Sequence, residues 1–132
     1  MYLLDTNILL ELLLNQKKAG DVERLLLNIP ARNLYLTEFS LYSIGIILIR
    51  QKKHSSFVSM VEDLIEKASI NVLRLLPGDL QDVANHAQSF NLDFDDAYQY
   101  AVAEKYGLTI VSFDSDFDRT SRGRKEPADI VP

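Results

Sequence analysis

Residues 93–116 read DFDDAYQYAVAEKYGLTIVSFDSD, and they place a helix, a turn and a strand in immediate succession. Apolar side chains recur every three or four residues from Phe94 to Val102, which predicts a helix over residues 93–106. Gly107 suits the C-cap of that helix. Residues 108–113 then combine β-branched and aromatic residues, as is typical of a buried strand. This stretch therefore predicts a sheet strand covered by the helix that precedes it.

The rest of the chain continues the alternation of strand and helix. Short apolar runs predict further strands at residues 2–4, 34–37, 72–76 and 130–131. Helical patterns lie between them, at residues 6–14 (capped by Thr6 or Asn7), 19–28, 38–53, 57–68 and 79–90. Apolar strands separated by helices indicate a parallel sheet covered on both faces. We expect one α/β domain over residues 1–132, a three-layer α/β/α sandwich with a mostly parallel sheet of four to five strands.

The composition is that of a globular domain with no special stabilising chemistry. Hydrophobic residues make up 47% of the chain and charged residues 25%. Cysteine is absent, which excludes disulfides, thiolate zinc sites and cysteine nucleophiles, and suits a cytoplasmic protein. No signal peptide is visible, and the apolar runs are too short to span a membrane. The net charge of −5 argues against a protein that coats nucleic acid, but not against an enzyme that cuts it.

Four aspartates stand where an α/β sheet places its ligands, beyond the carboxyl ends of the strands. Asp5 follows the first strand, Asp114 and Asp116 follow the strand at residues 108–113, and Asp96 lies in the first turn of the preceding helix. Carboxylates brought together repel one another unless protons or cations neutralise them. Oxygen ligands without histidine or cysteine favour Mg²⁺ or Mn²⁺, which can activate water against a phosphodiester. The sequence therefore predicts a metal-dependent hydrolytic site.

Three motifs resemble the PIN-domain family in order and spacing across nearly the whole chain. They are the runs Leu3–Asn7, Asp96-Ala97 and Val111–Phe117. The resemblance implies a Mg²⁺- or Mn²⁺-dependent endoribonuclease that hydrolyses RNA, often the VapC-type toxin that pairs with an antitoxin protein, and usually a homodimer. It also implies catalytic and metal-binding roles for Asp5, Asp96 and Asp114, with Asp116 as an auxiliary metal-binding acid. Asn7 and Ser112 are candidates to orient Asp5 or a metal-bound water.

One position departs from the family pattern. The family has a further acid on the helix after the second strand, six residues beyond a Ser or Thr, and counting from Thr37 reaches Ser43. A hydroxyl cannot supply the charge of a carboxylate, which puts a second metal ion and full activity in doubt. Glu38 is a candidate substitute, although it occupies a different helical phase. The alternative hypothesis is a catalytically weakened PIN-like domain that acts as a binding partner in a complex.

Other charged groups have weaker interpretations. A basic patch near the C-terminus is a candidate contact for the RNA backbone, with a solvated loop as the alternative; its members are Arg119, Arg122, Arg124 and Lys125. His54 and His86 lack the partners of a catalytic triad, so we expect surface or packing roles.

Rival folds and functions fit less well. A calcium loop starting at Asp114 would need glycine and glutamate where Arg119 and Lys125 stand. A haloacid dehalogenase-type phosphatase needs a lysine and acids well downstream of its nucleophile, and a phospho-receiver domain needs paired acids after its first strand. The helix at residues 38–53 carries apolar residues beyond one core face, which favours either a fully buried helix or a subunit or antitoxin interface; they are Leu41, Ile44, Leu48, Ile46, Ile47 and Ile49.

Overall fold

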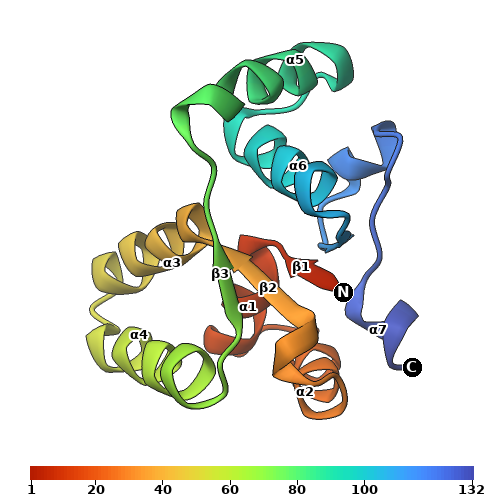
Figure 1. Cartoon of the computed structure of the whole chain (residues 1–132). Coiled ribbons are helices and arrows are strands. Elements are labelled where there is room, and N and C mark those ends of the chain that lie inside the picture. Colours follow the sequence, from red (N-terminus) through yellow and green to blue (C-terminus); the bar gives the residue numbers. More distant parts are fainter.

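A parallel sheet of four short strands forms the centre of the protein, in the order β3-β2-β1-β4 (Figure 1). The structure is a computed structural model that describes residues 1–132. The strands are β1 (Tyr2–Leu4), β2 (Leu34–Thr37), β3 (Asn71–Leu73) and β4 (Thr109–Val111). Each neighbouring pair is parallel. The mostly parallel α/β/α sandwich expected from the sequence is therefore confirmed.

Helices cover both faces of this sheet (Figure 1). One face carries α5 (Leu80–Phe90) and α6 (Phe94–Tyr106), and the other carries α1 (Thr6–Leu13), α2 (Ala19–Asn28), α3 (Glu38–Arg50) and α4 (His54–Met60). Successive strand residues enter opposite cores: Leu3 packs with α6, whereas Leu4 packs with α1 to α3. Both faces need apolar side chains, which is why the strands show no polar alternation.

Two predicted strands differ from the structure at the edges of the sheet. The fifth strand expected at residues 130–131 is wrong, because Pro127–Ile130 forms the short helix α7, with Pro127 in its first turn. The residue that pairs beside β4 is instead Lys125, in a single parallel bridge to Val111. The strand expected at residues 72–76 ends at Leu73, and the backbone N–H of Leu75 donates to the Tyr98 hydroxyl of α6 at 2.9 Å.

The helix boundaries also differ in places. The helix expected from residue 57 begins at His54 and continues beyond Met60 as a π-helix over Val61–Lys67. The N-cap of α1 is Asp5 rather than Thr6 or Asn7. Gly107 does cap α6 with φ of +67°, as expected. No helix combines the length and apolarity that crossing a bilayer requires.

Candidate metal centre

The carboxyl ends of the neighbouring strands β1 and β4 bring Asp5 beside the loop after β4. Strands β1 and β4 are parallel neighbours, and the Asp5 backbone N–H donates to the Val111 carbonyl at 2.9 Å. Asp5 is only 6% exposed, and its Oδ1 accepts from the Thr6 backbone N–H at 2.8 Å. Asp5 thus directly follows β1, caps α1 and is the first candidate acid of the site.

The Ser112 hydroxyl links Asp5 to this loop by donating one hydrogen bond and accepting two. Its Oγ donates to Asp5 Oδ2 at 2.7 Å and accepts from the Asp114 backbone N–H at 2.9 Å. It also accepts from Asn7 Nδ2 at 3.3 Å, while Asn7 Oδ1 accepts from the Phe113 N–H at 3.3 Å. Ser112 therefore contacts Asp5 directly, and Asn7 acts on Asp5 only through Ser112.

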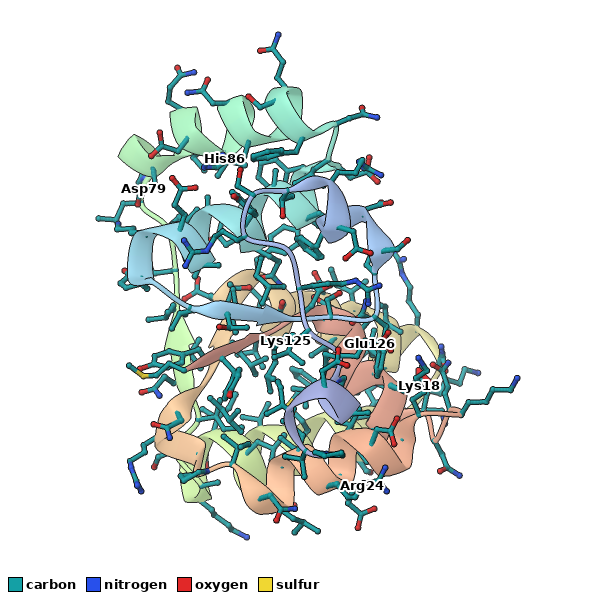
Figure 2. All side chains as sticks on the ribbon, turned by 90° about the vertical axis from the view of Figure 1, so that its right-hand side faces the viewer. Lys18, Arg24, Asp79, His86, Lys125 and Glu126 are labelled. Atoms are coloured by element: carbon teal, nitrogen blue, oxygen red, sulfur yellow. The ribbon has the colours of Figure 1, made fainter.

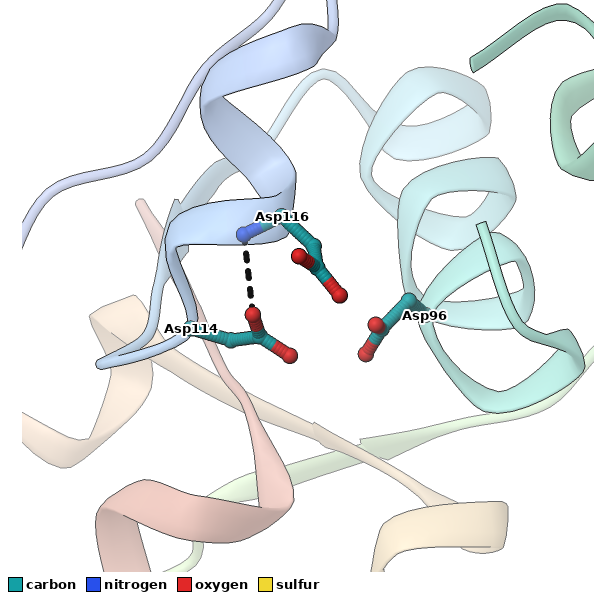
Figure 3. A group of neighbouring side chains, drawn as sticks. All are labelled: Asp96, Asp114 and Asp116. Atoms are coloured by element: carbon teal, nitrogen blue, oxygen red, sulfur yellow. Dashed lines mark hydrogen bonds between the residues drawn. The ribbon is translucent and has the colours of Figure 1, made fainter. Parts of the chain in front are cut away.

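Three other carboxylates meet at this end of the sheet (Figure 3). Asp96 comes from the first turn of α6, and Asp114 and Asp116 come from the start of the 3-10 helix Ser115–Arg119. One oxygen of each lies within 4.8 Å of one oxygen of each of the others. The Asp116 backbone N–H donates to Asp114 Oδ1 at 2.8 Å, which holds the two loop acids in place.

Burial and repulsion make the ionised forms of Asp96 and Asp5 unfavourable. Burial raises the pKa of Asp96 to about 8, and the charges of Asp5, Asp95 and Asp114 add to the rise. Burial also raises the pKa of Asp5, with Asp114 adding to it, although hydrogen bonds from Ser112, Thr6 and Gln99 oppose the shift. Like charges held together in a desolvated site bind a cation favourably, because the cation removes the repulsion.

The donor set fits a hard divalent cation. Asp96, Asp114 and Asp116 offer only carboxylate oxygens, the ligands that Mg²⁺ and Mn²⁺ prefer. Arg119 pairs with Asp116 Oδ1 at 3.0 Å and partly neutralises that acid, whereas neither Asp96 nor Asp114 has an ion pair. The arrangement can therefore concentrate a divalent cation, and with it a phosphate group, at the end of β4.

The predicted site residues do not all meet. Asp5 adjoins the three-acid group electrostatically, but its oxygens do not lie within the same 4.8 Å limit. Glu38, in the first turn of α3, also stays outside the group. Ser43 lies further along α3, in a shallow pocket that Thr6 and Asp95 also line. The structure thus brings Asp116 closer to Asp96 and Asp114 than the sequence suggested.

Two members of the predicted basic patch, Arg119 and Arg124, are held by several bonds to the protein itself. Arg119 donates to the backbone carbonyls of Phe90 and Asn91 as well as to Asp116. Arg124 pairs with Asp118 at 3.1 Å and donates to the Ser112 carbonyl at 3.1 Å.

The remaining two members of the patch are less constrained. Arg122 has one bond, to the Leu108 carbonyl at 3.3 Å, and Lys125 is exposed (Figure 2). These two side chains are the freer ones for contact with a ligand.

Two polar residues that the sequence analysis did not single out, Gln99 and Ser40, form a hydrogen-bonded chain to Asp5. Gln99, in the apolar stripe of α6, is 1% exposed and donates through Nε2 to Asp5 Oδ1 at 3.2 Å. The same Nε2 donates to Ser40 Oγ on α3. The one signal in the sequence is an amide directly before the apolar run Tyr100–Ala103.

The two histidines have the ordinary roles expected of them. His54 is exposed at the start of α4. His86 packs edge-on against Tyr100, with 4.8 Å between ring centroids, and its Nε2 lies 3.4 Å from a Glu104 oxygen, on the α5 side of the molecule (Figure 2).

Comparisons with known proteins agree on one fold. The family model described as "PIN domain" matches residues 2–123. The solved structure of VapC20 from Mycobacterium tuberculosis, described as a sarcin-ricin loop cleaving toxin, is 19% identical, with a TM-score of 0.79, and the match covers 92% of this chain and 96% of that one.

Two further structures are similar. FitAcB from Neisseria gonorrhoeae is 18% identical with a TM-score of 0.77, and the match covers 97% of this chain and 99% of that one. A toxin-antitoxin complex from Klebsiella pneumoniae is 16% identical with a TM-score of 0.75, covering 96% and 98%. At these identities the likeness shows the fold alone. No curated protein sequence matches the chain.

Proposed function

Because the chain belongs to the PIN-domain family, we propose that it is a divalent-cation-dependent endoribonuclease and the toxin of a toxin–antitoxin pair. The observation that carries this proposal is the meeting of Asp96, Asp114 and Asp116 within 4.8 Å, with buried Asp5 beside them. Acids from distant parts of the chain converge where a parallel sheet places its ligands, which a set of isolated helix caps would not do. Mg²⁺ or Mn²⁺ is the cation we propose.

Each acid has a distinct proposed task. Asp96 and Asp114 bind the cation directly, and Asp116 assists because Arg119 already shares its charge. Asp5, held in position by Ser112 and Thr6, adds negative charge and offers an oxygen to the cation. A bound divalent cation would activate water and offset the charge that develops on the phosphodiester.

An RNA substrate and an antitoxin partner are parts of the same proposal. They are supported by the fold that the chain shares with VapC20, described as cleaving the sarcin-ricin loop, and with proteins of toxin-antitoxin complexes. Of the basic patch, we propose that Lys125 and Arg122 contact the RNA backbone, because both are exposed and neither has an ion pair. Arg119 and Arg124 would contact it less directly, because they hold the loop after β4.

Cleavage of a mixed RNA substrate tests the proposal. We expect cleavage by the wild-type protein with Mn²⁺ and none with EDTA, and we expect Asp96→Asn and Asp5→Asn to lower the rate at least about 100-fold. Asp95→Asn is the matched control, because Asp95 is exposed in the same turn of α6 and lies outside the three-acid group. Equal cleavage by all four proteins would mean that the activity comes from another site or from a contaminant.

The second candidate function is a weakened PIN-like domain that serves as a binding partner in a complex. Ser43 favours it, because the acid of the family pattern is missing on α3. Ser43→Glu distinguishes the two hypotheses: a weakened enzyme gains activity from the restored acid, whereas an intact one does not need it. Gln51→Glu, at the exposed C-cap of α3, controls for added charge.

We further propose that the protein forms a homodimer through the outer face of α3. Tyr42, Ile46 and Ile49 are 58%, 53% and 47% exposed, and Phe94 at the start of α6 is 56% exposed. Side chains of this size rarely gather on a free surface without a partner. The face adjoins Asp95 and Ser43, so a second copy there would border the acidic group.

A further inference from the structure

Asp5 is connected to α3 through a chain of buried side chains. Gln99 Nε2 donates both to Asp5 Oδ1 and to Ser40 Oγ. Ser40 Oγ also accepts from Thr6 Oγ1 at 2.8 Å. Asp5, Ser40 and Gln99 are all buried, so little water is present to replace these bonds. Three separate elements, α1, α3 and α6, therefore fix the position of one carboxylate.

These bonds use the two oxygens of Asp5 unequally. Oδ1 accepts from the Thr6 N–H and from Gln99, which occupies both of its lone pairs. Oδ2 accepts only from Ser112. The Ser112 hydroxyl already accepts from Asn7 and from the Asp114 N–H, so its single proton has to point at Asp5. Only Oδ2 retains a free lone pair.

The orientation of the Gln99 amide leaves its oxygen without a hydrogen bond. With its NH₂ group on Asp5 and Ser40, Gln99 Oε1 is the one buried side-chain oxygen in the structure without a hydrogen-bond partner. The reverse orientation would face an amide oxygen against the Asp5 carboxylate, two acceptors with no proton between them. The fold thus leaves one acceptor unpaired and keeps a donor on Asp5.

We propose that Gln99 is a positioning residue for cation binding, which occupies Asp5 Oδ1 and leaves Oδ2 as the single oxygen that Asp5 can offer to a cation. The inference rests on the proposed function, since it concerns the same site. The proposal also gives α3 a role at the site, although α3 carries Ser43 in place of the family's acid. The helix contacts Asp5 indirectly, through the neutral Ser40 hydroxyl and the Gln99 amide. Groups that orient a metal ligand in this way strengthen binding without touching the metal.

Mn²⁺ binding to the protein prepared without metal tests this role. The free Mn²⁺ is followed by its electron paramagnetic resonance signal, so the readout does not depend on RNA cleavage. We expect Gln99→Met, which keeps the length of the side chain but has no donor, to raise the Mn²⁺ dissociation constant about 10-fold or more. Ser40→Ala removes the second acceptor of the Gln99 amide and should raise the Mn²⁺ dissociation constant by a smaller factor.

A double-mutant cycle separates positioning from a general loss of stability. If Ser40 acts on Asp5 through Gln99, the double variant Gln99→Met with Ser40→Ala binds Mn²⁺ no more weakly than Gln99→Met alone. Tyr98→Phe is the matched control, because it removes a buried hydrogen bond from the adjacent position of α6, at the Leu75 N–H. We expect it to lower stability and to leave Mn²⁺ affinity unchanged.

The outcomes distinguish a failure of the proposed role of Gln99 from a failure of the proposed function. Wild-type affinity in Gln99→Met, or an equal loss of affinity in Tyr98→Phe, would overturn the role of Gln99 while the proposed function stands. If Gln99→Met does not fold, Ser40→Ala decides, and unchanged affinity there would overturn it. A wild-type protein that binds no Mn²⁺ would overturn the proposed function and this inference together.

Discussion

Ser112 Oγ donates a 2.7 Å hydrogen bond to Asp5 Oδ2, although the two residues are 107 positions apart in the sequence. The bond joins the ends of β1 and β4 at the point where the acids gather. It is also the only bond that Oδ2 receives from the protein. Ser112 is thus the side chain through which the loop after β4 sets the position of Asp5.

Replacing Ser112 with alanine should therefore affect both stability and metal binding. Ser112→Ala leaves buried Asp5 with one bond fewer, and we expect the free energy of unfolding to fall by about 1–3 kcal/mol. Mn²⁺ affinity should fall about 10-fold, because Asp5 is less well fixed. Urea denaturation and Mn²⁺ titration measure the two effects. Ser115→Ala, an exposed position in the same loop, should change neither.

The pKa of Asp96 predicts how the stability of the metal-free protein depends on pH. Folding raises this pKa from 3.8 to about 8, so the folded state holds the proton more tightly than the unfolded state. The resulting stability is fully present below about pH 4 and is lost as the pH rises to about 8. The raised pKa of Asp5 acts in the same direction. In EDTA, the free energy of unfolding should thus fall over this range.

Substitution and metal addition test that dependence. Asp96→Asn should flatten the profile, because the amide does not titrate. Exposed Glu62→Gln, in the π-helix after α4, should leave it as in the wild type. Added Mn²⁺ should stabilise the wild type more at pH 8 than at pH 5, since the cation favours the ionised acids. A flat wild-type profile in EDTA would contradict the crowding of the carboxylates.

The exposed face of α3 predicts an effect on oligomeric state. Ile46→Asp places a charge at the centre of the proposed interface and should convert a dimer into a monomer, without unfolding a side chain that is already 53% exposed. Light scattering after size-exclusion chromatography measures the mass. Leu27→Asp is the control, because Leu27 is 76% exposed on α2. A monomeric wild type would remove the dimer proposal.

The positive φ of Gly107 predicts that any other residue at this position lowers the stability of the fold. Its φ of +67° is a conformation that other residues adopt with strain, and no atom lies within 4 Å of where a Cβ would stand. Gly107→Ala should therefore lower the free energy of unfolding by about 1 kcal/mol through strain alone. Gly78→Ala, with equally open surroundings and no positive φ, should cost less. Equal effects would show that the turn relaxes.

The sequence predicted the elements whose patterns are local and strong. The helix from residue 94 to 106, its glycine cap and the strand after it follow from periodicity and β-branched residues. The placement of Asp96 and Asp114 together also followed, because a parallel sheet brings strand ends to one edge. Asp116 was predicted as an auxiliary acid. That it, rather than Asp5, joins Asp96 and Asp114 within 4.8 Å was not predicted, because this depends on the 3-10 helix that begins at Ser115.

What could not be predicted depends on contacts between distant residues. Ile130 and Val131 look like a strand, but Pro127 and the reciprocal bonds of Glu126 and Asp129 start a helix instead. Gln99 shows no pattern in the sequence, since its role comes from Ser40 and Asp5, 59 and 94 positions away. A single polar residue in an apolar stripe indicates burial with a partner, but not which partner.

The single bridge between Val111 and Lys125 has a consequence for the behaviour of the protein in solution. Strand β4 is the outermost strand on its side, and an uncovered margin of this kind can recruit strands from other molecules. The chain after Gly123 lies along it, held by Lys125 and by the Lys18–Glu126 ion pair that Figure 2 labels. The final residues therefore cover this edge against such pairing, and shortening the chain there would expose β4.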